Sequence, residues 1–111
     1  MKWLQVGEVG DFEKITKIEV AGKKLCVINY GGELFALASK CPHAGADLSK
    51  GWCEKGKLIC PYHRYSYDLL TGRGSEGQND FVNTYPVKVE NNYIFIGISS
   101  FWETFMNIFT S

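Results

Sequence analysis

The sequence CPHAGADLSKGWCEKGKLICPYHRY, residues 41–65, holds both histidines of this 111-residue chain and three of its four cysteines. One residue separates Cys41 from His43, and two residues separate Cys60 from His63. A thiolate and an imidazole at these spacings can point into one small volume. Two such segments supply four ligands, which is enough to complete one metal site.

Two kinds of metal centre accept a mixed set of two cysteines and two histidines. One is a tetrahedral zinc ion held by all four side chains. The other is a [2Fe–2S] cluster in which two histidines replace two cysteines on one iron. On the spacing alone, both interpretations stay open.

The composition suits one globular domain with a modest core, because 45% of the residues are hydrophobic and 14% are aromatic. Twelve basic residues balance twelve acidic ones, so we expect neither nucleic acid nor an anionic membrane as a partner. Residues 1–12 lack the apolar core of a signal peptide, and no apolar run approaches the roughly 20 residues of a membrane span. We therefore expect a cytoplasmic protein with reduced thiols, in which metal binding explains the cysteines better than disulfides do.

Short apolar segments separated by turn signals at intervals of roughly ten residues predict an antiparallel β body. Gly31-Gly32 and Asn91-Asn92 indicate hairpin turns, because such residues tolerate positive φ. The apolar alternation lapses between Ser39 and about Leu58, which places the cysteines and histidines on loops, and 72–80 is a second polar loop. The expected strands cover 2–6, 17–20, 25–30, 34–38, 85–90 and 93–98.

The segments CPH at 41–43 and CPYH at 60–63, sixteen residues apart, resemble the two-loop signature of Rieske iron–sulfur proteins. Gly45 and Pro61 stand where that family has them, and YDLLTG at 67–72 is similar to the family's continuation into a strand. The resemblance covers roughly residues 2–98. It implies an all-β fold, a Rieske-like antiparallel β sandwich or barrel, with cluster-binding loops at about 39–68 inside a domain spanning 1–100.

Carried over to this sequence, the resemblance implies one [2Fe–2S] cluster per chain. Cys41 and Cys60 would hold one iron, and His43 and His63 the other. Two neutral imidazoles in place of two thiolates leave the cluster less negative, which raises its reduction potential. The imidazoles also carry ionisable protons, so electron uptake can be coupled to proton uptake.

The resemblance also narrows the function. Ring-hydroxylating oxygenases add a mononuclear iron held by two histidines and a carboxylate, but both histidines of this chain are already assigned to the cluster. We therefore expect an electron-transfer component, not a self-contained enzyme: a soluble ferredoxin between a flavin reductase and a terminal oxygenase or reductase. The alternatives are the small subunit of an assimilatory nitrite reductase and a zinc-stapled interaction module.

Three residues match no position of the family pattern. Cys26 lies in an apolar run and is expected to be a small buried hydrophobe, and Cys53 is expected to be a free thiol without a role. Arg64 follows the second histidine, where the family commonly has glycine. If this position requires a positive φ, the arginine is strained there.

The sequence also predicts a redox range. High-potential members of the family carry two further cysteines that pair across the loops, and Ala46 and Tyr62 occupy those positions here. Tyr65 replaces a serine that donates a hydrogen bond to the cluster, while Tyr67 matches a tyrosine whose hydroxyl can reach a ligand sulfur. Fewer donors to sulfur predict a low potential.

The C-terminal residues 101–111 form the pattern of a short amphipathic helix. We expect its apolar face to be buried on the chain's own β body, or on a partner or second copy. Membrane binding is the least favoured option, because the polar face carries no Lys or Arg. The apolar face consists of Phe101, Trp102, Phe105, Met106, Ile108 and Phe109.

Overall fold

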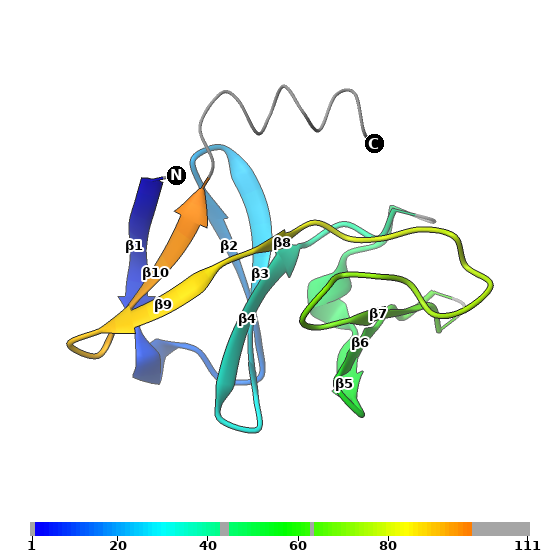
Figure 1. Ribbon diagram of the computed structural model, residues 1–111, viewed down its shortest axis with the longest axis horizontal. Helices are drawn as coiled ribbons and strands as arrows, with labels where there is room; N and C mark the ends of the chain where they lie inside the picture. The colour runs from blue at the N-terminus through cyan, green and yellow to red at the C-terminus, as the bar shows by residue number, and fades with distance from the viewer. Residues whose placement is uncertain (1, 43–44, 63, 99–111) are drawn as a thin grey trace.

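The computed structural model describes residues 2–42, 45–62 and 64–98 and is nearly all-β, with three antiparallel sheets (Figure 1). The first sheet has the order β1–β10–β9, with β1 at Lys2–Glu8, β10 at Tyr93–Ile98 and β9 at Val87–Glu90. The second has the order β2–β3–β4–β8. Its strands are Ile15–Val20, Lys23–Tyr30, Glu33–Ala38 and Thr84–Tyr85. The predicted all-β antiparallel fold is confirmed.

These two sheets pack against each other through an aliphatic core. Leu25 and Val27 of β3 and Ala36 of β4 contact Ile94 and Ile96 of β10. All five side chains are at most 2% exposed. A short 3-10 helix, η1 (Val9–Asp11), connects β1 to β2 on the way to buried Phe12. Alternate residues of each strand thus build the core of a β sandwich.

The second sheet is covered on both faces. Alternate residues of β3, Cys26 and Ile28, point away from the sandwich core and belong to a second buried cluster. From β4, Leu37 joins the same cluster. The run Leu25–Ile28 is therefore continuously apolar because each face of the strand meets a different core.

The second core lies between this sheet and a small third sheet, seen beside β3 and β4 in Figure 1. Its strands are β5 (Trp52–Glu54), β6 (Lys57–Ile59) and β7 (Ser66–Asp68), and a 3-10 helix, η2 (Leu48–Lys50), precedes them. Cys41 and Cys60 lie on loops as predicted, whereas Cys53, also expected on a loop, lies on β5. Strands of three residues are too short to show a period-2 pattern.

Four hairpin turns share one backbone conformation. Both central residues have positive φ at Ala21-Gly22, Gly31-Gly32, Lys55-Gly56 and Asn91-Asn92. This is the requirement of two-residue type I′ turns, whose twist matches that of the paired strands. The hairpins predicted at Gly31-Gly32 and Asn91-Asn92 are confirmed.

The predicted C-terminal helix at 101–111 lies outside the described residues, so it and the domain boundary at residue 100 stay predictions. Across the described ranges, the structure contains no helix of the length and apolarity needed to cross a membrane.

Candidate metal centre

The two predicted cysteine ligands are buried together at one end of the second core. Cys41 lies three residues beyond the end of β4, and Cys60 directly follows β6. Their exposed fractions are 1% and 0%. His43 and His63 lie outside the described residues.

The loops that begin at these cysteines have the same backbone design. The amide of Cys41 donates to the carbonyl of Ala46 at 2.8 Å, and the amide of Cys60 donates to the carbonyl of Tyr65 at 2.7 Å. In each case the acceptor carbonyl belongs to the residue five positions after the cysteine. The residue before each acceptor has a left-handed conformation: Gly45 has φ 69° and Arg64 has φ 56°.

This symmetry explains two sequence observations. Gly45 adopts its positive φ without steric cost, because glycine has no Cβ. Arg64 adopts the same conformation with a side chain, which costs about 1–2 kcal/mol for a residue of this kind. The expected strain at Arg64 is confirmed.

The thiols of Cys41 and Cys60 influence each other. Burial raises the pKa of the Cys60 thiol, the Tyr62 backbone amide at its sulfur lowers it, and the adjacent Cys41 thiol raises it further. No disulfide joins them. Two buried neighbouring thiols with a donor at sulfur fit a metal–thiolate centre, because metal replaces the protons that burial retains.

Tyr67 places a hydroxyl group at the sulfur of Cys41. Its side chain on β7 is fully buried, and its hydroxyl oxygen lies 3.3 Å from Cys41 Sγ. Burial, with the neighbouring Cys41 and Asp80, raises the pKa of Tyr67, so the hydroxyl stays protonated. The Tyr67 hydroxyl thus reaches the sulfur of Cys41, as the family match predicted, while the role of Cys41 as a ligand stays a prediction.

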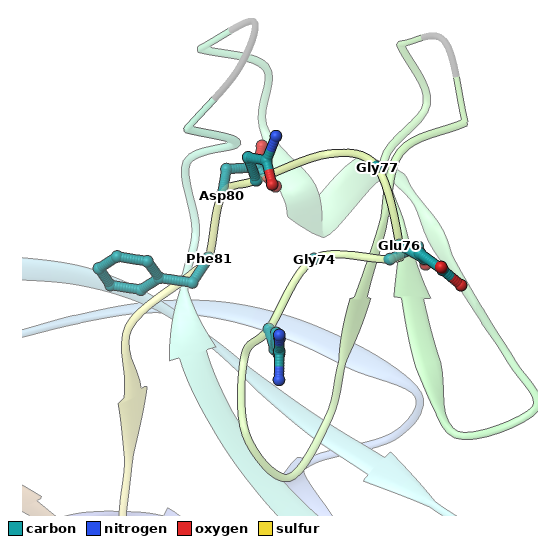
Figure 2. A pocket seen from close by; sticks show the side chains of 8 residues that line it. Gly74, Glu76, Gly77, Asp80 and Phe81 are labelled. Carbon is teal, nitrogen blue, oxygen red and sulfur yellow. The ribbon is translucent and has the colours of Figure 1, made fainter.

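Asp80 is a neighbour of this site that the sequence pattern did not reveal. The hydroxyl of Tyr67 donates to Asp80 Oδ2 at 3.0 Å. Asp80 lies at the end of the polar loop 72–80, which forms an open depression of about 710 Å³ with Phe81 (Figure 2). In this view Phe81 extends away from Asp80. A polar loop without periodicity gives no signal for such a contact.

Cys26 and Cys53 have no ligand role in the sequence pattern. Cys26 is fully buried on β3, and burial raises its pKa to about 12, as suits a small hydrophobe. Cys53 is half-buried on β5, opposite Leu58, and burial raises its pKa as well. Raised pKa values make both thiols poor nucleophiles at neutral pH.

Comparisons with known proteins identify the family. Residues 2–86 match the model of the Rieske [2Fe-2S] domain, and this chain belongs to that family. A ferredoxin component of the naphthalene 1,2-dioxygenase system from Pseudomonas putida is 32% identical over 104 residues, 89% of this chain and 98% of the relative. Family membership implies a [2Fe–2S] cluster as the cofactor.

Solved structures agree with the fold. Sphingomonas yanoikuyae B1 ferredoxin superposes with a TM-score of 0.76 at 26% identity, covering 88% of this chain and all of that one. The ferredoxin of carbazole 1,9a-dioxygenase from Nocardioides aromaticivorans IC177 gives a TM-score of 0.81 at 23% identity, covering 89% and 100%. The second likeness supports the fold alone.

Proposed function

We propose that this chain is a Rieske ferredoxin that carries single electrons from a reductase to a terminal oxygenase. The observation that carries the proposal is the buried pair Cys41 and Cys60, with the Tyr67 hydroxyl at the sulfur of Cys41, in a chain of the Rieske family. The naphthalene dioxygenase relative supports the role, because it is named a ferredoxin component and matches along almost its whole length.

We assign the ligands from the sequence pattern and the family. Cys41 and Cys60 would hold one iron, and His43 and His63 would hold the other. When bound, the cluster supplies a one-electron redox couple. The chain excludes water from the two sulfurs by burying them, and it directs the amide of Tyr62 at Cys60. Donors of this kind stabilise negative charge at sulfur and so set the potential.

The surface near the two loops supports transient docking of a redox partner. Tyr62 is 60% exposed and Phe81 is 50% exposed. Pro42 and Lys40 line a shallow depression together with Phe81. Exposed aromatic side chains with a cation nearby are typical of small, short-lived interfaces. A flavin reductase and an oxygenase of the cytoplasm would each bind here in turn.

Protein purified without oxygen tests the function. It should be brown, contain iron and sulfide in equal amounts, bleach with dithionite and show a Rieske-type EPR signal when reduced. It should then pass electrons from a nicotinamide-linked flavin reductase to an oxygenase. Colourless protein containing zinc would overturn the proposal in favour of an interaction module, and a stable complex with a large reductase subunit would favour the nitrite reductase alternative.

The midpoint potential tests the kind of ferredoxin. No cysteine forms a disulfide, and Tyr65 stands in the place of the donor serine. We expect a midpoint in the lower half of the family span of about −150 to +300 mV, nearer its bottom. Protein-film voltammetry at neutral pH measures it. A value above roughly +100 mV, within the same span, would contradict the ferredoxin assignment.

A further inference from the structure

The Tyr67 hydroxyl lies between two acceptors. Cys41 Sγ is 3.3 Å from the hydroxyl oxygen on one side, and Asp80 Oδ2 is 3.0 Å from it on the other. When Cys41 is a thiol, all three groups can be satisfied, because the S–H donates to the tyrosine oxygen and the O–H donates to the carboxylate.

Metal binding removes the S–H proton of Cys41 from this series of hydrogen bonds. A cysteine that ligates iron is a thiolate and has no proton to donate. The tyrosine then has one O–H for two negatively charged acceptors, the sulfur of Cys41 and the carboxylate of Asp80. The carboxylate oxygen is the stronger acceptor of the two, because sulfur accepts hydrogen bonds only weakly, and the hydroxyl donates to Asp80 Oδ2.

We propose that Asp80 is a positioning residue that lowers the midpoint potential by holding the Tyr67 hydroxyl proton away from the Cys41 sulfur. This inference rests on the proposed function, since it concerns the bound cluster. With the O–H directed at Asp80, the oxygen lone pairs face the sulfur and give the reduced cluster no stabilisation. The negative charge of Asp80 acts in the same direction.

The loop 72–80 is folded to hold this carboxylate in place. Gln78 Nε2 donates to Asp80 Oδ1 at 3.1 Å, and Gln78 Oε1 accepts from the amide of Ser66 at 3.0 Å. The amide of Gly74 donates to the carbonyl of Asp80 at 2.9 Å. A Cβ at Gly74 would collide with the Asp80 carboxylate, so only glycine allows this close approach. The two carboxylate oxygens thus have separate donors.

Four proteins test the inference: the wild type, Asp80→Ala, Tyr67→Phe and the double variant, each loaded with its cluster. Their midpoints are measured by protein-film voltammetry. Asp80→Ala should raise the equilibrium constant for reduction about tenfold, which is 59 mV for one electron, because the freed hydroxyl turns to the sulfur. Tyr67→Phe should change it less than about threefold in the wild type, yet lower it about tenfold in the Asp80→Ala background.

The change in midpoint caused by the double substitution, compared with the sum of the two single changes, distinguishes this role of Asp80 from an effect of its charge alone. If the two substitutions add, Asp80 acts through its charge alone and the inference is wrong. It is equally wrong if Tyr67→Phe lowers the midpoint as much in the wild type as in the Asp80→Ala background. Glu76→Gln is the matched control, since Glu76 is an exposed acid on the same loop, and it should leave the midpoint unchanged.

Further variants keep the test decisive. Asp80→Asn preserves the side-chain size and should raise the midpoint even if Asp80→Ala folds poorly. Asp80→Glu keeps a carboxylate and should stay closer to the wild type than Asp80→Asn does. Iron, sulfide and the EPR signal are measured first: a wild type without a Rieske signal overturns the proposed function, whereas normal signals with additive midpoints overturn only the role of Asp80.

Discussion

The two cores of this molecule are built in different ways. The core between the first two sheets consists of aliphatic side chains and Phe12, and long paired strands surround it. The core under the third sheet contains three of the four cysteines and Tyr67, and its strands pair over only three residues each. Hydrophobic burial specifies the first core, whereas the second also depends on turn conformation, polar contacts and bound metal.

The largest expected difference between the cores comes from ligand removal. Cys60→Ala or His43→Ala should abolish assembly of the normal cluster and lower the melting temperature, because metal-binding energy is partly folding energy. Iron and sulfide content, EPR and thermal unfolding measure this. Cys53→Ala, which removes a half-buried thiol of the same region, should keep both cluster and signal. An unchanged Rieske signal in either ligand variant would refute the ligand assignment.

A substitution in the aliphatic core should lower stability but leave the cluster unchanged. Ile96→Ala on β10 removes a fully buried side chain and should reduce the free energy of unfolding by about 2–5 kcal/mol. The folded variant should retain the EPR signal and midpoint of the wild type, because Ile96 belongs to the core without cysteines. A shifted midpoint would show that the two cores are not independent.

Removal of residues 101–111 tests whether their apolar face is buried on the β body or on a second copy. Truncation after Ser100 should lower the free energy of unfolding by roughly 2 kcal/mol, the value of one large buried side chain, or convert an oligomer to a monomer. Thermal unfolding and sedimentation measure the two outcomes. Unchanged melting temperature and oligomeric state would contradict the expected burial of the amphipathic face.

The contrast between the cores also explains what the sequence reveals. Strands 25–30 and 93–98 were predictable because their apolar patterns are long, and Gly31-Gly32 marked its hairpin. The pair Cys41 and Cys60 was predictable from ligand spacing, which is chemistry independent of the strand pattern.

Other features depend on contacts between distant residues. Strands β5 and β6 are too short to leave a periodic pattern, so they were missed, and β7 was expected only through the resemblance at 67–72. The hydrogen bond from Tyr67 to Asp80 joins residues thirteen positions apart, and nothing in the polar loop marks the acceptor. Only the three-dimensional path of the loop 72–80 brings that carboxylate to the hydroxyl.

The smallest expected effects concern the segments that follow Cys41 and Cys60, where Gly45 and Arg64 share a left-handed conformation. Gly45→Ala places a Cβ on a residue with φ 69° and should destabilise the protein by about 1 kcal/mol. The nearest atom to that Cβ, Lys40 Cε at 3.4 Å, leaves room for it, so the backbone conformation alone is responsible.

Arg64→Gly makes the reverse change in the other loop and should stabilise the holoprotein. Relief of a left-handed non-glycine residue contributes about 1–2 kcal/mol, and the greater freedom of glycine in the unfolded chain offsets about 0.5–1 kcal/mol of it. The net gain therefore lies between zero and about 1.5 kcal/mol, visible as a small rise in melting temperature. The EPR signal should not change, because the loop keeps its conformation. If both variants destabilise the protein equally, the Arg64 side chain contributes more than its backbone strain costs, and the two loops are not equivalent.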